Sequence, residues 1–301
     1  MIHTENLAKR FRSTEALRGL NIDVQSSSIY ALVGPNGAGK TTAIKILMNI
    51  LRATSGRAEV MGIDSRLLAG EAFTSIGYVS ENQELPDWMT VRDFLGYMRP
   101  FYPTWDRQLE TELVRQFDLP LGVKLRALSR GMRMKAALAS SLAYRPKLIV
   151  LDEPFSGLDP LVRDELIQSL SERAAEATVF ISSHDLTEVE SIADYVGYLQ
   201  DGTLLFSEEM KLLSNRFREV EVVLQAHAPA CNPWPSTWMQ VDVSGSPVRF
   251  VETRFDVDQT RERIRAMFGE VLSVTYHRMS LRSIFVVIAR GTEARIGRVR
   301  L

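Results

Sequence analysis

The sequence predicts an α/β protein with a parallel sheet, followed by a small α+β domain at the C-terminal end of the 301-residue chain. Two segments predict the sheet. An apolar run at 29–33 precedes a glycine-rich loop at 34–42 and a helical pattern, and a second apolar run at 148–151 ends in two carboxylates. From residue 148 to residue 207, strand and helix patterns alternate again, which favours parallel strands connected by helices.

The glycine-rich loop, GPNGAGKTT, fits G-x-x-x-x-G-K-[ST], the phosphate-binding loop of nucleotide hydrolases. Its glycines allow successive backbone N–H groups to point at phosphate oxygens, and the helix N-terminus adds partial positive charge. We expect Lys40 to reach the β- and γ-phosphates and the Thr41 hydroxyl to bind Mg²⁺. The strand–loop–helix context disfavours a chance glycine-rich turn, although the loop alone leaves GTPases, kinases and many ATPases open. The candidate nucleotide-binding residues are Gly34, Pro35, Asn36, Gly37, Ala38, Gly39, Lys40, Thr41 and Thr42.

The second apolar run ends in Asp152 and Glu153, followed by a proline. A carboxylate at the end of a strand beside the phosphate-loop strand is suited to hold Mg²⁺ through its water shell, which predicts a metal site at Asp152. Glu153 would then face the γ-phosphate and deprotonate the attacking water. Two acids that end a strand are also compatible with an ordinary solvated turn, but the phosphate loop upstream favours the catalytic interpretation.

A third segment, Leu-Ser-Arg-Gly-Met at 128–132, precedes an amphipathic helical pattern. Ser129 is typical of a helix N-cap, and Gly131 leaves its backbone amide open to an anion. Taken alone, this segment predicts only a capped helix.

The order of these segments is more specific than any one of them. The chain contains, in this order, the phosphate loop, residues 128–132, the Asp-Glu strand, the tetrapeptide Ser-Gly-Leu-Asp at 156–159 and His184. The same order is found in the ATP-binding subunits of ATP-binding cassette (ABC) transporters. The chain resembles these subunits over residues 2–208, about two-thirds of its length. The resemblance is to the bacterial export type. It implies a P-loop NTPase core, in which the parallel sheet is joined by a β-subdomain and a helical subdomain, with ATP and Mg²⁺ as cofactors.

The same resemblance implies partners and roles. Two subunits, in a homodimer or a heterodimer, would close on ATP so that Ser129 and Gly131 of one meet the γ-phosphate held by the other. Asp159 would lie in the loop that crosses between the subunits, and His184 would contact the γ-phosphate as a catalytic residue with Glu153. A separate transmembrane permease would hold the pair on the cytoplasmic, inner face of the membrane, and hydrolysis would drive export.

Four positions of the chain, Phe11, Glu81, Arg130 and Met132, bear on how closely it follows the family pattern. The family has an aromatic side chain that stacks on adenine where this chain has Phe11, although Phe11 is equally compatible with a core position. The family pattern at 128–132 has Gly and Gln where this chain has Arg130 and Met132. Glu81 replaces the usual Gln; a carboxylate still holds a metal-bound water, so Glu81 is a candidate metal residue together with Thr41. We interpret the exchanges as marks of a subfamily.

The chain is expected to divide into a nucleotide-binding domain at 1–210, with a helical insert at about 82–145, and an accessory domain at 215–301. Thr90 and Asp93 form a potential capping box for a helix that ends near residue 98, and a second helix is predicted at 105–117. Aromatic residues of the insert would either dock a partner helix or form the insert's own core; they are Trp88, Phe101, Tyr102 and Trp105.

The composition of the chain excludes some classes of function. A net charge of −1 gives no sign of a nucleic-acid partner, and the single cysteine, Cys231, excludes an internal disulfide. No run approaches the ~20 apolar residues that cross a bilayer, so membrane work falls to a separate protein. The alternative is a soluble ABC-type ATPase that acts on a macromolecular complex without a permease, although such relatives usually carry two cassettes or a coiled-coil insertion. A binding-only regulator is disfavoured by the intact catalytic residues.

Overall fold

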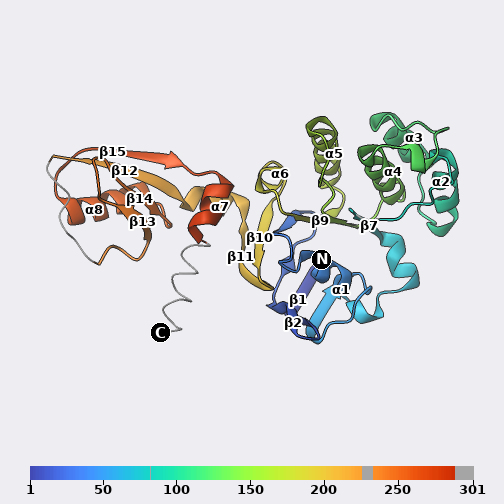
Figure 1. Ribbon diagram of the computed structural model, residues 1–301, viewed down its shortest axis with the longest axis horizontal. Helices are drawn as coiled ribbons and strands as arrows, with labels where there is room; N and C mark the ends of the chain where they lie inside the picture. Colours follow the sequence, from blue (N-terminus) through green and yellow to red (C-terminus); the bar gives the residue numbers. More distant parts are fainter. Residues whose placement is uncertain (82, 226–232, 289–301) are drawn as a thin grey trace. The chain divides into compact units, whose positions relative to one another are not determined.

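The computed structural model describes residues 1–81, 83–225 and 233–288, and the chain divides into two units, Met1–Glu208 and Glu209–Leu301 (Figure 1). The sequence predicts the boundary near residue 210. Cys231 lies outside the described residues. No helix among the described residues is both long and apolar enough to cross a membrane.

The centre of the first unit is a six-stranded sheet in the order β11-β10-β4-β9-β8-β7. Its strands are β4 (Ile29–Val33), β7 (Ile76–Ser80), β8 (Leu148–Asp152), β9 (Thr178–Ser183), β10 (Tyr195–Gln200) and β11 (Thr203–Glu209). Every residue of β4, β8 and β9 is buried, because helices and a second sheet cover both faces. Figure 1 shows α4 (Arg130–Leu142), α5 (Pro160–Arg173) and α6 (Leu186–Glu190) on one side and α1 (Lys40–Leu47) on the other. The predicted α/β class with a parallel sheet is confirmed.

The register of the parallel strands fixes where the site forms. Ser80 pairs with Asp152, and Asp152 pairs with Ser182, while Val33 pairs with Ser183 on the next strand. Because these residues end their strands, the segments that follow all leave the sheet at one edge. The loop after β4 and the residues after β7, β8 and β9 therefore come together there.

A second, antiparallel sheet covers the face that carries α1. Its strands are β1 (Ile2–Phe11), β2 (Thr14–Leu20), β3 (Asp23–Val24), β5 (Ser55–Val60) and β6 (Ile63–Asp64). Leu7, Leu20 and Val24 share one core with Ile44 and Leu47 of α1. Strands occupy residues 2–11 and 55–60, and the segment 20–24 contains the last residue of β2 and all of β3, with Asn21 and Ile22 between them.

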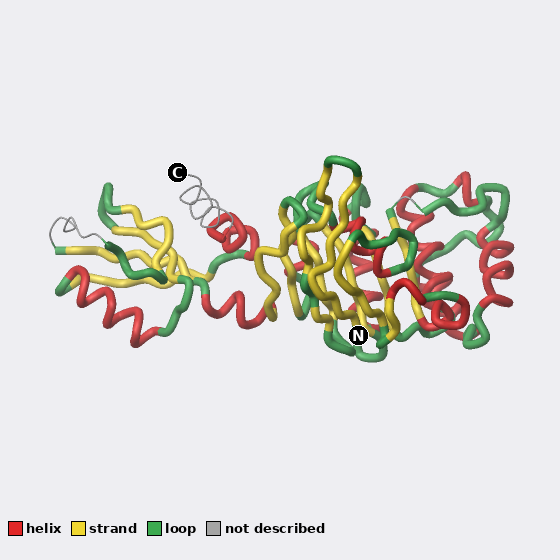
Figure 2. Tube along the Cα trace, turned by 90° about the horizontal axis from the view of Figure 1, so that it is seen from below, coloured by secondary structure: helices red, strands yellow, loops and turns green. Residues whose placement is uncertain are grey.

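The helical insert contains α2 (Val91–Met98), α3 (Arg107–Gln116) and α4, with single turns at Arg99–Phe101 and Leu125–Ala127. Further turns, at Ser65–Leu67 and Gly70–Ser75, precede β7. Figure 2 shows the insert helices gathered beside the sheets. The capping box of Thr90 and Asp93 is confirmed. The second helix begins later than predicted, because the Asp106 side chain accepts hydrogen bonds from the first free backbone amides and caps it.

The aromatic side chains of the insert separate into two groups. Trp105 donates its indole N–H to Glu110 at 2.8 Å, and Tyr102 stacks on Tyr144 with ring centroids 3.8 Å apart, so both belong to the insert's own core. Trp88 is 71% exposed, and Phe101 is also exposed.

The second unit contains a four-stranded antiparallel sheet in the order β13-β14-β12-β15. One helix precedes the first of these strands in the sequence, and another connects β14 to β15. Its elements are α7 (Met210–Arg216), β12 (Arg218–Leu224), β13 (Trp238–Asp242), β14 (Val248–Glu252), α8 (Val257–Phe268) and β15 (Val271–Arg278). Val220, Phe250 and Ile264 form its buried core with Trp238. The arrangement agrees with the expected α+β domain.

Candidate active site

The phosphate loop connects β4 to α1 at the edge of the central sheet. Gly39 caps α1 with φ of 110°, a left-handed conformation that favours glycine. A Cβ on Gly39 would lie 2.4 Å from the carbonyl oxygen of Ala16, and one on Gly34 would lie 2.0 Å from that of Leu199. Neighbouring backbone therefore requires glycine at both positions. The loop lines a cavity of about 220 Å³, whose walls are Ala16, Asn36, Gly37, Ala38, Gly39, Lys40, Thr41, Thr42, Glu81 and Glu153.

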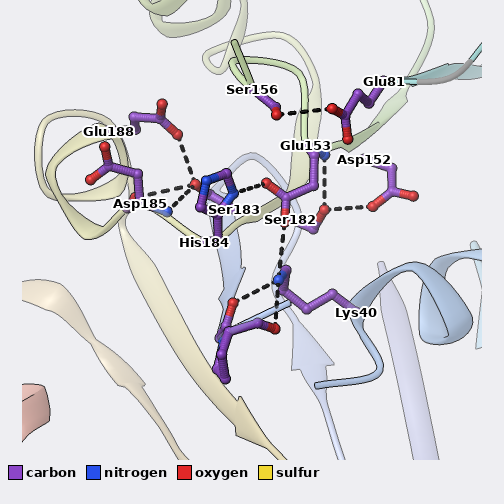
Figure 3. A network of polar contacts seen from close by, with 12 residues as sticks. Lys40, Glu81, Asp152, Glu153, Ser156, Ser182, Ser183, His184, Asp185 and Glu188 are labelled. Carbon is purple, nitrogen blue, oxygen red and sulfur yellow. Dashed lines mark hydrogen bonds and ion pairs between the residues drawn. The ribbon is translucent and has the colours of Figure 1, made fainter. Parts of the chain in front are cut away.

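Lys40 is buried and lines this cavity, and Figure 3 shows its ammonium group directed to the Glu153 carboxylate. Its Nζ donates to the carbonyl oxygens of Gly34 and Pro35 at 2.6 and 3.2 Å, and forms an ion pair with Oε1 of Glu153 at 3.0 Å. A buried cation needs such partners, since burial alone disfavours charge. The phosphate loop and the strand that carries the two acids are thus joined directly through Lys40.

Asp152 is buried beside the start of α1. Its Oδ1 accepts hydrogen bonds from the hydroxyl groups of Ser182 at 2.7 Å and Thr41 at 3.1 Å. Burial raises the pKa of Asp152, and these hydrogen bonds only partly offset it. A nearby cation would favour the ionised carboxylate, so the environment suits a metal ion.

The donor set at this place fits Mg²⁺. Thr41 supplies a hydroxyl oxygen and Asp152 a carboxylate, and Glu81 lines the same cavity. Within the described residues there is no cluster of three or more His, Cys, Asp or Glu that could enclose a metal. Mg²⁺ usually takes one or two protein carboxylates and keeps water and substrate phosphates as its other ligands, and Asp152 with Thr41 fits that requirement.

Glu153 follows Asp152 in a left-handed conformation with φ of 52°, which is uncommon for a residue other than glycine. Its carboxylate is 11% exposed, and Oε2 lies 2.7 Å from Nδ1 of His184. The Glu153 backbone N–H donates to Oγ of Ser182 at 3.0 Å, while the same hydroxyl donates to Asp152. Ser182 therefore positions both acids. Sequence reasoning missed this residue, although the two serines that end an apolar strand directly before the histidine are a usable signal.

Two predicted residues lie outside the cavity, at the start of α4. Ser129 caps the helix, its Oγ accepting from the backbone N–H of Met132 at 3.3 Å. A Cβ on Gly131 would lie 3.2 Å from a methyl group of Val162, so close packing against α5 also favours glycine there. Neither residue lines the cavity that holds Lys40, so one chain does not bring the two halves of the predicted site together.

Asp159 and Phe11 are also outside the cavity. Asp159 caps α5, with Oδ1 accepting from the backbone N–H of Val162 at 3.1 Å. Phe11 ends β1, is 43% exposed and carries the ammonium of Lys9 at 4.8 Å from its ring centroid. The interpretation of Phe11 as a core residue is therefore wrong, and its stacking on adenine stays a prediction.

Glu81 lines the cavity but does not point to the predicted metal residues. Its backbone N–H donates to the carbonyl oxygen of Asp152 at 2.9 Å, which fixes its place at the end of β7. Its carboxylate accepts hydrogen bonds from Arg130 and Ser156. Burial raises the pKa of Glu81, but these two hydrogen bonds lower it more. The pKa of Glu81 is therefore below its ordinary value, and the carboxylate stays ionised to a lower pH than a free glutamate.

Known proteins resemble this chain in sequence and fold. The family model described as "ABC transporter" matches residues 17–156. An uncharacterized ABC transporter ATP-binding protein of Synechocystis is 34% identical over 245 residues, which cover 75% of this chain and 67% of that protein. The bacitracin transport ATP-binding protein BcrA of Bacillus licheniformis is 32% identical over 223 residues, 73% of each chain. A solved dimeric ATP-binding cassette with bound ADP and Pi has the same fold, with a TM-score of 0.63 at 23% identity over 70% of this chain and 99% of that one.

Proposed function

This chain belongs to the ABC transporter ATP-binding proteins, and on that premise we propose that it binds ATP with Mg²⁺, hydrolyses it and powers export through a separate membrane permease. The observation that carries the proposal is the contact of Glu153 with both Lys40 and His184 at the wall of the phosphate-loop cavity. A lysine for phosphate, a carboxylate for water and a histidine that orients the carboxylate are the groups that hydrolysis of a phosphoanhydride requires.

The residues of the cavity divide the work of binding. Backbone amides of residues 36–41 and the N-terminus of α1 receive the phosphate oxygens, and Lys40 supplies the fixed positive charge. Thr41 and Asp152 would hold Mg²⁺, with Glu81 as a third candidate. Bound Mg²⁺ would neutralise charge on the phosphates.

The hydrolytic step uses the two residues that follow β8 and β9. Glu153 would act as the general base: its carboxylate would accept the proton of the attacking water while the water oxygen bonds to the γ-phosphorus and the bond from that phosphorus to the β,γ-bridging oxygen breaks, with ADP as the leaving group. His184 holds this carboxylate through Nδ1 and would contact the γ-phosphate from the same side. The unusual backbone of Glu153, fixed by Ser182, supports the role because strained conformations are kept where function needs them.

A second ABC subunit would complete the site. Ser129 and Gly131 are at the exposed start of α4 and away from their own cavity, so they are free to face the γ-phosphate of a partner's ATP, and Asp159 lies at the start of the neighbouring helix. The dimeric cassette of the same fold supports this arrangement.

Exposed Trp88 and Phe101 on the insert support docking to a permease, because large aromatic side chains on a surface favour partner contacts. The permease would hold the chain on the inner face of the membrane and would select the cargo. The name of BcrA, a bacitracin transport protein, supports a role in transport for this chain, and the direction of export follows from its resemblance to bacterial export cassettes.

The test is nucleotide binding by Lys40→Ala, with Lys45→Ala on the same helix as the control. Removal of a buried charged donor to phosphate is expected to weaken ATP binding by at least roughly tenfold to a hundredfold, whereas Lys45→Ala keeps wild-type affinity. Wild-type affinity in Lys40→Ala would refute the phosphate-loop assignment. Purification from membranes together with a polytopic protein distinguishes the transporter subunit from the alternative, a soluble ABC-type ATPase that acts on a macromolecular complex.

A further inference from the structure

Two of the three residues that depart from the family pattern, Arg130 and Glu81, contact each other. Arg130, at the first position of α4, donates from Nη2 to Oε1 of Glu81 at 2.5 Å. The hydroxyl of Ser156, in the loop after β8, donates to the same oxygen at 2.9 Å, as Figure 3 shows. One carboxylate oxygen thus joins three segments that are far apart in the sequence.

The backbone at Gly157 leaves room for the guanidinium group of Arg130. It lies against Gly157, where a Cβ would be 3.1 Å from Nη1 and 3.2 Å from Cζ. Gly157 also has φ of 66°, a backbone conformation that side chains rarely adopt. A glycine at 157 therefore leaves the space that the guanidinium needs beside Glu81.

Glu81 stands between two cavities. On one side is the phosphate-loop cavity with Thr41, and on the other is a cavity of about 200 Å³ that is lined by Arg130 and Arg133. The Glu81 backbone is anchored to Asp152, so only its side chain is free to turn from one cavity to the other. In the structure it is turned to Arg130.

We propose that Arg130 is a positioning residue that competes with Mg²⁺ for the carboxylate of Glu81. This rests on the proposed function, because it requires Mg²⁺ with a nucleotide in the phosphate-loop cavity. Arg130 is 51% exposed, so its side chain can leave Glu81 without leaving a buried charge. Metal binding at Thr41 and Asp152 would draw Glu81 away and free Arg130, beside Ser129 and Gly131, to face the second subunit.

The test measures metal binding directly. Mn²⁺ replaces Mg²⁺ as the probe, and electron paramagnetic resonance reports free Mn²⁺ in a titration of the full chain with a non-hydrolysable ATP analogue. Arg130→Gln releases Glu81 and is expected to tighten Mn²⁺ binding by roughly two- to fivefold, the range of a half-exposed ion pair. In the Glu81→Gln background the same substitution is expected to have no effect. Arg130→Lys, which keeps the charge but loses the planar guanidinium, should give a smaller shift.

Arg133→Gln is the matched control. Arg133 lies on the same helix and forms an ion pair of the same kind, with Asp87 at 2.6 Å, but it does not contact Glu81. Its substitution should leave Mn²⁺ binding unchanged. The melting temperature of each variant identifies any that fails to fold. If Arg130→Gln fails to fold, the Mn²⁺ affinity of Arg130→Lys is compared with that of Arg133→Gln instead.

The outcomes distinguish a failure of the proposed function from a failure of the proposed competition between Arg130 and Mg²⁺. If the wild-type chain binds no Mn²⁺ with the nucleotide analogue, the proposed function itself fails. If the wild type binds but Arg130→Gln leaves the Mn²⁺ affinity unchanged or weaker, Arg130 does not compete for Glu81. An equal effect of Arg130→Gln with and without Glu81→Gln would also overturn the inference, because competition requires the carboxylate.

Discussion

Replacement of Glu153 by glutamine removes one negative charge from the site and almost no volume. The amide can still approach Nδ1 of His184 and Nζ of Lys40, which lie 2.7 and 3.0 Å from the carboxylate oxygens. The left-handed backbone is held by Ser182, which bonds to the backbone N–H and not to the side chain. Glu153→Gln should therefore keep the fold and the shape of the cavity and lose only the base.

The structure gives opposite expectations for hydrolysis and for binding. Loss of a general base slows the chemical step by roughly 10²–10⁴-fold, which corresponds to about 2.7–5.4 kcal/mol of activation free energy. ATP binding should become stronger, by about tenfold, because Lys40 no longer has to leave a charged partner, and a hydrogen bond between charged groups contributes about 1.5–3 kcal/mol.

The assay is single-turnover hydrolysis with protein in excess over radiolabelled ATP, together with equilibrium binding of a fluorescent ATP analogue. Glu188→Gln is the control, since Glu188 is a buried carboxylate near His184 that hydrogen-bonds to Ser183 and does not line the cavity. A wild-type rate in Glu153→Gln would remove Glu153 from the role of base. A slow rate combined with equally weakened ATP binding would show general damage to the pocket and would refute the reasoning as well.

Two further predictions concern the neighbours of this site and the insert. His184→Ala should slow single-turnover hydrolysis by about 10²-fold, because Glu153 loses the side chain that orients it; a rate unchanged from wild type would contradict this. Glu110→Gln should lower the stability of the insert by about 1–2 kcal/mol at pH 7, because Glu110 accepts two hydrogen bonds from Arg99. Burial raises the pKa of Glu110, but the bonds from Arg99 and Trp105 lower it more, so its contribution is present above the unfolded pKa of about 4.3 and is lost as pH falls through the folded value. The difference between the melting temperatures of wild type and variant should therefore shrink as the pH falls below the unfolded pKa and vanish below the folded pKa, and a constant difference at all pH values would contradict the assignment.

The parts of the fold that short sequence patterns specify were predictable. The phosphate loop, the Thr90 capping box and the Ser129 cap each depend on residues within a few positions of one another, so the pattern carries its own geometry. The start of α3 was predicted too early because Asp106 satisfies the first amides of that helix, and this choice between neighbouring residues depends on the final backbone.

The contacts that complete the candidate site were not predictable in the same way. Arg130 and Glu81 are 49 positions apart, and Ser182 follows Asp152 by 30. Which side chains meet depends on the strand register and on the approach of α4, neither of which a local pattern contains. The two exchanges at 81 and 130 were each visible in the sequence, but only the fold shows that they form one ion pair.

The pairing of Lys40 with Glu153 also bears on how a turnover ends. When the terminal phosphate departs, the lysine loses its strongest anionic partner, and the nearby carboxylate is placed to take over at 3.0 Å. This replacement would weaken the binding of the remaining ADP and favour its release. The same two side chains that begin a round of hydrolysis would thereby reset the pocket for the next nucleotide.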